Sequence, residues 1–150
     1  AAGPKDIIKA IGKIQSQSTS NPSSISQAAA VEALNGPQGF IKTRSKAFKE
    51  RRDFVVKSLN AIDGIECLNP DGAFYVFPSC KGLMGKKDSN GKELKTDTDF
   101  VKSLLETSGI AVVQGSAFGL EGFFRISYAT SMKKLKKALD KISTFCKGLN

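Results

Sequence analysis

The sequence predicts an α+β fold in which helices pack on a small β-sheet. From residue 4 to residue 62, and again near the C-terminus, apolar residues recur at the spacing of one helix face. Between residues 63 and 128 the pattern changes to short alternating or aromatic segments bounded by glycine, proline and asparagine. A chain of 150 residues with 40% hydrophobic and 25% charged residues is long and apolar enough to form a core.

Two helices are expected before residue 37. The first, from Pro4 to about Gln15, is predicted by four isoleucines on one face: Ile7, Ile8, Ile11 and Ile14. The second is expected to begin with Asn21 as its N-cap and Pro22 at its first position, because asparagine and proline favour those positions. It is expected to stop at Asn35-Gly36.

A third, long helix is expected from residue 37 to residue 62. Its apolar residues keep a period near 3.6 throughout, which corresponds to a helix about 39 Å long. A compact domain formed by residues 63–150 would have a radius of gyration of only about 12 Å. We therefore expect this helix to extend past that domain and to connect it with a second body.

The region after residue 62 is expected to begin with a hairpin-like pair of strands. Ile65-Glu66-Cys67 alternates between apolar and polar residues, and Ala73–Phe77 is aromatic and β-prone. Residues 69–72 between them have the composition of a turn. Gly82–Lys95, which follows, is expected to be an exposed loop without a motif.

The rest of the chain predicts a helix, two strands and a final helix. Thr96 and Asp99 are spaced as in a capping box, and Gly109 is expected to end the helix that they begin. Strands are expected at residues 110–113 and 123–128.

The net charge of the chain is +9, and six of its lysines lie on the final helix. These lysines lie opposite an apolar face; they are Lys133, Lys134, Lys136, Lys137, Lys141 and Lys147. A solvated helix face is the favoured explanation. An autonomous basic module that binds nucleic acid is the alternative function, although the sequence contains no motif for RNA or DNA binding.

Composition disfavours several classes of protein. No apolar run approaches the roughly 18 residues of a membrane-spanning helix, and the first residues lack the pattern of a secretory signal, so we expect a soluble, cytoplasmic protein. The chain has no histidine, which excludes Ser-His and Cys-His dyads. Cys67, Cys80 and Cys146 form no CxxC pair, so free thiols are expected and a metal site is not.

Arg125 is the main candidate for a binding residue. It lies within Phe123–Ala129, a run that otherwise predicts a short buried strand. Because a guanidinium stays charged, such an arginine requires an anion or several hydrogen bonds. Gly115–Gly119, just upstream, would let backbone approach the same ligand. These residues predict a carboxylate site, with a salt bridge from Arg125 to Asp71 or Glu121 as the alternative.

Five segments occur in an order that is similar to a known family. They are Gly3-Pro4-Lys5, Gln17–Pro22, Gly72-Ala73-Phe74-Tyr75, Gly109–Gly115 and Phe124–Ala129. In these segments the chain resembles the class I aminotransferases, pyridoxal-phosphate enzymes of the aspartate aminotransferase fold, and most of all their bacterial aspartate aminotransferase subgroup. The resemblance extends over essentially the whole chain.

The resemblance implies a division of the chain. Residues 1–36 would be the end of the large cofactor-binding domain, residues 37–62 the connecting helix and residues 63–150 the small domain, so the chain would be a C-terminal portion. The Schiff-base lysine and most ligands of pyridoxal phosphate would lie upstream. We therefore expect no catalytic residue in these 150 residues, and an isolated fragment that is inactive and does not bind the cofactor.

The resemblance also implies roles for single residues. Arg125 would bind the α-carboxylate of the amino-acid substrate through its planar fork. Gly72 and Phe74 would form part of the wall facing the substrate, with a plain hairpin turn and a core aromatic as the alternative. Ser18 and Asn21 would lie near the cofactor and the dimer interface, with helix capping as the alternative for Asn21.

The reaction implied is transfer of an amino group from L-aspartate to 2-oxoglutarate by a homodimer. In the aspartate aminotransferases of animal cytosol and enteric bacteria, an arginine just before the Ser-Asn-Pro segment binds the side-chain carboxylate of the substrate. Here Ser16 and its neighbours include no arginine. The amino-acid and 2-oxo-acid specificity, including any use of prephenate, is therefore left open.

Overall fold

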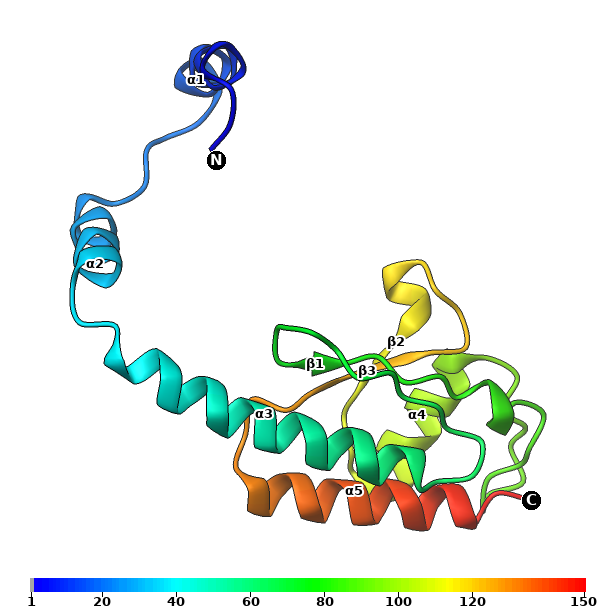
Figure 1. Cartoon of the computed structure of the whole chain (residues 1–150). Helices are drawn as coiled ribbons and strands as arrows, with labels where there is room; N and C mark the ends of the chain where they lie inside the picture. Colours follow the sequence, from blue (N-terminus) through cyan, green and yellow to red (C-terminus); the bar gives the residue numbers. More distant parts are fainter. Residues whose placement is uncertain (1) are drawn as a thin grey trace. The chain divides into compact units, whose positions relative to one another are not determined.

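The structure, a computed structural model, describes residues 2–150, and the chain divides into two compact units, residues 1–40 and residues 41–150. The first unit contains helices α1 (Lys5–Ser18) and α2 (Ser24–Asn35), which Figure 1 labels. Neither helix has a buried residue. Both expected helices are confirmed. No helix within residues 2–150 is long and apolar enough to cross a membrane.

The ends of these two helices differ from expectation. Helix α1 continues to Ser18, and the hydroxyls of Ser16 and Ser18 donate to carbonyls one turn earlier, where they do not compete for the backbone N–H groups of the helix. Asn21 as the N-cap of α2 is wrong. The N-cap is Ser23, whose backbone is extended and whose carbonyl accepts the first helical hydrogen bond.

The second unit is an α+β structure, as predicted. After α3 (Gly39–Asn60), which begins just before the division, its elements are β1 (Tyr75–Val76), η1 (Lys81–Leu83), α4 (Asp97–Ser108), β2 (Val113–Gln114), η2 (Gly115–Phe118), β3 (Phe124–Ser127) and α5 (Met132–Lys147). The sheet has the order β1-β3-β2, and both pairs are antiparallel. Helix α3 is confirmed, a little shorter at each end than expected.

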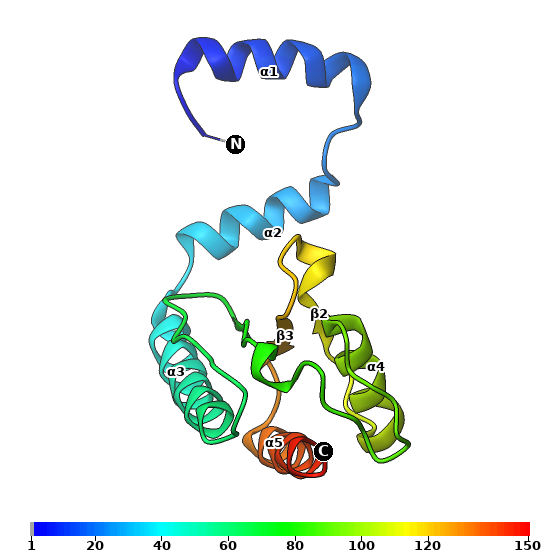
Figure 2. The ribbon, with the colours of Figure 1, turned by 90° about the vertical axis from the view of Figure 1, so that its right-hand side faces the viewer.

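The core lies on one face of this sheet. Val76 and Phe124 point to that face and are almost completely buried. Helices α3, α4 and α5 lie around the sheet, as Figure 2 shows, and supply much of the rest of the core, including Val55, Leu59, Phe100, Leu104, Leu135, Leu139 and Ile142. Tyr75, Val113 and Arg125 share the opposite face, where each is partly or largely exposed.

The expected hairpin is wrong. Strand β1 pairs with β3 rather than with residues 65–67, and Glu66 makes only an isolated bridge with Ser79. The central strand comes from far along the chain, so its pairing depends on tertiary packing that local alternation does not reveal. The backbone N–H of Tyr128 donates to the carbonyl of Phe74, which adds a hydrogen bond at the end of the β1–β3 pairing.

Residues 82–95 are not simply an exposed loop. Leu83 and Leu94 are buried in the core, and Asp88 is only 5% exposed. One oxygen of Asp88 accepts from the backbone N–H groups of Asn90 and Lys92, and the other accepts from the Ser103 hydroxyl of α4. This carboxylate ties the segment to the core, because it accepts both from the segment's own backbone and from the buried Ser103 hydroxyl of α4.

Two further expectations are confirmed. Thr96 and Asp99 form a reciprocal capping box at the start of α4, and Gly109 ends that helix with a φ of 65°. The three cysteines are free and buried. Burial raises the pKa of Cys67 to about 11 and, with a contribution from Asp97 at Cys80, the pKa values of Cys80 and Cys146 to about 12, so all three are weak nucleophiles.

Candidate functional site

Arg125 lies on the face of β3 that the helices leave uncovered. Successive strand residues point to opposite faces, so Phe124 enters the core while Arg125 points away from it. The run around Arg125 is therefore buried on one face and not on both. The charge of the guanidinium does not have to be neutralised inside the core.

Two aromatic rings contact the guanidinium. The Cζ atom of Arg125 is 4.4 Å from the ring centroid of Tyr75 and 4.4 Å from that of Phe118. Tyr75 pairs with Ser127, two residues from Arg125, so Tyr75 is the diagonal cross-strand neighbour on the same face. Phe118 comes from η2, which follows β2. Cation–π contact of this kind stabilises a positive charge without using its N–H donors.

The expected alternative, a salt bridge from Arg125 to Asp71 or Glu121, does not form. The ion pairs within residues 2–150 are Lys49–Asp53, Arg52–Asp53, Lys92–Asp99 and Lys95–Glu93. In this part of the chain no carboxylate neutralises Arg125. The guanidinium therefore keeps the donors and the charge with which an arginine binds a planar anion.

Within the segment Gly115–Gly119, the first glycine is required by contacts of the chain with itself. A Cβ atom at Gly115 would overlap the carbonyl oxygen of Leu120 and come within 2.8 Å of the Cβ of Phe123, so this glycine permits close approach of the chain to itself. The Gly115 N–H donates to the Phe123 carbonyl at 2.7 Å. Asp97, which is 2% exposed, accepts the Ser116 N–H at 2.7 Å. Sequence reasoning missed Asp97, since it appears only as one more acidic residue in the first turn of a helix.

Gly72 and Phe74 lie in the turn before β1. A Cβ at Gly72 would have no neighbouring atom within 4 Å, so the structure shows no close approach there. The constrained residue is Ala73, which has a φ of 60°, and the Tyr128 hydroxyl donates to its carbonyl at 3.0 Å. Phe74 is 41% exposed and packs on the ring of Tyr75 at 4.5 Å, so it is not a core aromatic.

Ser18 and Asn21 belong to the first unit. The Ser18 hydroxyl donates to the carbonyl of Ile14 at 2.9 Å within α1, and Asn21 is exposed between α1 and α2. Their expected place near a cofactor and a dimer interface stays a prediction.

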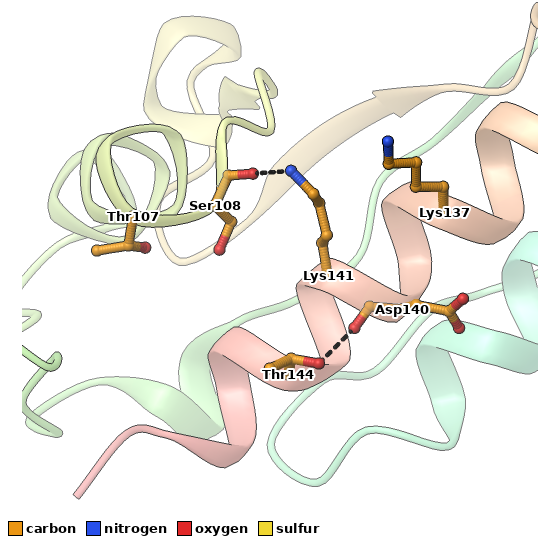
Figure 3. A pocket seen from close by; sticks show the side chains of 6 residues that line it. All are labelled: Thr107, Ser108, Lys137, Asp140, Lys141 and Thr144. Carbon is orange, nitrogen blue, oxygen red and sulfur yellow. Dashed lines mark hydrogen bonds between the residues drawn. The ribbon is translucent and has the colours of Figure 1, made fainter.

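The lysines of α5 are exposed, and one of them, Lys141, contacts the end of α4. A hollow of about 510 Å³ lies between the C-terminal turn of α4 and α5, and Figure 3 shows that Lys137, Lys141 and Asp140 all line it. Lys141 donates to the carbonyl of Ser108 at 2.6 Å. A cation at the C-terminal carbonyls of a helix complements the helix dipole. Charges of both signs occur in the hollow, so it does not resemble a surface that follows a phosphate backbone.

The fold and the uncovered arginine define a class of protein. The chain belongs to the aminotransferase class I and II family, whose model matches residues 1–142. This is a family of pyridoxal-phosphate-dependent enzymes, so the resemblance noted from the sequence is confirmed.

Relatives with established names agree with this assignment. The chain is 59% identical to an aspartate aminotransferase of Rhizobium meliloti (strain 1021) and 53% identical to an aspartate/prephenate aminotransferase of Cereibacter sphaeroides, in both cases over all its residues. It spans 37% and 38% of the length of these two proteins. The chain thus corresponds to somewhat over a third of each relative.

Solved structures show the same fold. The crystal structure of the aspartate aminotransferase from Rhizobium meliloti matches all of this chain with a TM-score of 0.92 at 59% identity, over 38% of that chain. The aspartate aminotransferase of Thermus thermophilus with maleate matches 96% of this chain with a TM-score of 0.81 at 35% identity, over 35% of that chain. The fold is therefore aspartate aminotransferase-like.

The lysines that the structure describes all lie at the surface or are only partly covered. Attachment of pyridoxal phosphate requires a lysine amine in a desolvated setting, and no lysine within residues 2–150 is buried. Arg125, by contrast, presents a charged guanidinium beside two aromatic rings on a partly exposed face of the sheet.

Proposed function

We propose that this chain is the part of an aspartate aminotransferase that binds the α-carboxylate of the substrate, through Arg125. One observation carries the proposal. The guanidinium lies on the uncovered sheet face, is contacted by two aromatic rings and forms no ion pair within the described residues. A guanidinium in this state can meet a carboxylate with two parallel hydrogen bonds.

The relatives support the substrate class. Proteins 53% and 59% identical over the whole chain bear the names aspartate/prephenate aminotransferase and aspartate aminotransferase. The Thermus thermophilus structure that shares the fold contains maleate. Maleate is a dicarboxylate, which is the chemistry expected of a site that binds L-aspartate and 2-oxoglutarate. Prephenate is a further candidate for the amino acceptor.

The proposal includes the organisation drawn from the sequence. Residues 1–36 belong to the end of the cofactor domain, residues 37–62 form the connecting helix and residues 63–150 form the small domain of a cytoplasmic homodimer. The Schiff-base lysine lies outside residues 1–150, in agreement with the exposure of the lysines here. Pyridoxal phosphate, when bound, supplies the electron sink of transamination.

The remaining site residues are assigned on the same basis. Gly72 and Phe74 contribute to the wall facing the substrate, which the exposure of Phe74 beside Tyr75 supports. Ser18 and Asn21 are assigned to the neighbourhood of the cofactor and the dimer interface. The alternative of a nucleic-acid-binding module is disfavoured, because the lysine face of α5 includes Lys141 in a contact that caps α4.

The test is Arg125→Lys in the full-length enzyme, since lysine keeps the charge but loses the planar fork. Truncating one member of a buried charge pair costs about 2 to 5 kcal/mol, so kcat/KM for aspartate should fall roughly 30-fold to several-thousand-fold. Arg51→Lys is the matched control, because Arg51 also contacts a ring, that of Phe48 at 5.2 Å, and has no assigned role. An unchanged kcat/KM in Arg125→Lys would contradict the proposal.

A further inference from the structure

We propose that Tyr75 and Phe118 are positioning residues that fix the orientation of the Arg125 guanidinium, and that Asp97 holds the segment carrying Phe118. This inference rests on the proposed function, because it concerns how the same arginine meets a carboxylate. The rings contact the cation and leave its N–H donors for the ligand. Asp97 acts one step further away, through the backbone of η2.

The first ring is held by the strand pairing. Tyr75 pairs with Ser127 across the β1–β3 ladder. The turn before β1 is also attached to Tyr128, the residue that follows β3. The Tyr128 hydroxyl donates to the carbonyl of Ala73, and the Tyr128 backbone N–H donates to the carbonyl of Phe74. Ala73 keeps its unfavourable positive φ under these bonds. The backbone that presents Tyr75 therefore has little freedom to move relative to Arg125.

The second ring is held by a buried carboxylate. Phe118 is 49% exposed, so core packing alone does not fix its place. The η2 segment that carries it is bound at Gly115 by the Phe123 carbonyl and at Ser116 by Asp97. Asp97 is the first residue of α4, whose Phe100 and Leu104 are completely buried. The Asp97 hydrogen bond therefore helps to fix the position of Phe118, together with the Gly115–Phe123 hydrogen bond and the edge contact between the Phe118 and Phe77 rings, whose centroids are 6.0 Å apart.

Restricting the guanidinium has a consequence for binding. An arginine side chain has several rotatable bonds, and holding it in one geometry on binding costs conformational entropy. Two rings at 4.4 Å restrict it before the ligand arrives. A pre-oriented fork therefore binds a carboxylate more tightly than a free one would, and only ligands that carry this carboxylate gain from it.

The experiment uses the full-length enzyme with Phe118→Leu and Tyr75→Leu, and maleate as the probe. A cation–π contact contributes about 1 to 2 kcal/mol, so each change should raise the Kd of maleate about 5- to 30-fold. Leu105→Ala is the control, because Leu105 is 48% exposed, much like Phe118, and belongs to α4 rather than to the segments that carry Arg125 and its two rings. Maleate affinity should stay within twofold of the parent in the control.

A second readout separates positioning from general damage to the fold. The half-reaction with aspartate should slow in Phe118→Leu, whereas that with an amine lacking the α-carboxylate should be unchanged. When Phe118→Leu is added to Arg125→Lys, the Kd of maleate should rise less than twofold above that of Arg125→Lys alone, since the ring acts through the arginine. Equal losses in both backgrounds, or unaltered maleate binding in both ring variants, would overturn the inference.

The role of Asp97 has its own pair of variants. Asp97→Ala removes the acceptor for the Ser116 N–H, whereas Asp97→Asn retains an oxygen at that place. The alanine variant should repeat the pattern of Phe118→Leu, and the asparagine variant should restore most of the affinity. If Arg125→Lys itself leaves maleate binding unchanged, the proposed function fails; if Arg125→Lys weakens it and the ring variants do not, positioning alone fails.

Discussion

Helices α1 and α5 carry the same spacing of apolar residues with opposite results. In each helix three such residues stand at i, i+4 and i+7: Ile7, Ile11 and Ile14 in α1, and Leu135, Leu139 and Ile142 in α5. Yet Ile14 is 70% exposed, whereas Ile142 is 1% exposed. Spacing of this kind predicts a helix and the direction of its apolar face. Burial of that face depends on a complementary surface within the same compact unit, which only the second unit supplies for its own helices.

The largest effect that tests this comparison is expected from Ile142→Ala in the 150-residue chain. Ile142 belongs to the core and is 1% exposed, so its truncation should lower the free energy of unfolding of the second unit by about 2 to 5 kcal/mol. Chemical denaturation followed by circular dichroism would measure the change. A loss below about 1 kcal/mol would show that the face of α5 is not packed as described.

A smaller effect is expected where the second unit buries a polar group. Ser103 is completely buried, and its hydroxyl donates to Asp88, so Ser103→Ala should leave a carboxylate oxygen without its donor. The expected loss of stability is about 1 to 3 kcal/mol. Thr144→Ala is the control, since the Thr144 hydroxyl is exposed and bonds within its own helix, and it should stay within about 0.5 kcal/mol. Equal effects would show that residues 82–95 do not depend on this contact.

Acid should weaken the second unit through the same contacts. The hydrogen bond from Ser103 lowers the pKa of Asp88, and the hydrogen bond from Thr96 lowers the pKa of Asp99. A carboxyl whose pKa is lower in the folded than in the unfolded chain stabilises the fold above its unfolded pKa of about 3.9, and this contribution is lost as the pH falls through the folded value. The denaturant concentration at the unfolding midpoint, measured from pH 6 to pH 2, should decrease once the pH is below about 4. The decrease should be smaller in Asp88→Asn, which lacks one of these carboxyl groups. A midpoint that does not change with pH in the parent would contradict the lowered pKa values.

The sequence predicts those features of this molecule that depend on local chemistry. Helix periodicity, the capping box at Thr96 and the stop at Gly109 follow from residue types at fixed spacing, and all three are present. Strand pairing is different, because β1 and β3 are far apart in the chain and the ladder of β1 is only two residues long. Local alternation cannot show which distant strand will lie alongside.

In the candidate site, too, local sequence predicted one part, and tertiary structure determines the other. An arginine within an apolar run was enough to single out Arg125, because an unneutralised guanidinium among apolar residues requires an explanation. Its surroundings could not be predicted, since Phe118 and Asp97 reach it only through the tertiary course of η2. That only one face of β3 is covered by the core was also missed, although an arginine flanked by Phe124 and Ile126 is consistent with such a strand.

The smallest effect, close to zero, is expected for Ile14→Ala in the 150-residue chain. Ile14 is largely exposed, and alanine is a better helix former than isoleucine by a few tenths of a kcal/mol, so stability should change by less than about 0.5 kcal/mol. In the full-length enzyme the same substitution should cost about 2 to 5 kcal/mol, because the proposed division places residues 1–36 in the cofactor domain, where this face of α1 would be covered. Denaturation of both proteins with and without the substitution measures the difference. A negligible effect in the full-length enzyme as well would contradict that division, since an amphipathic helix that stays exposed in the complete protein would not belong to the packed part of a domain.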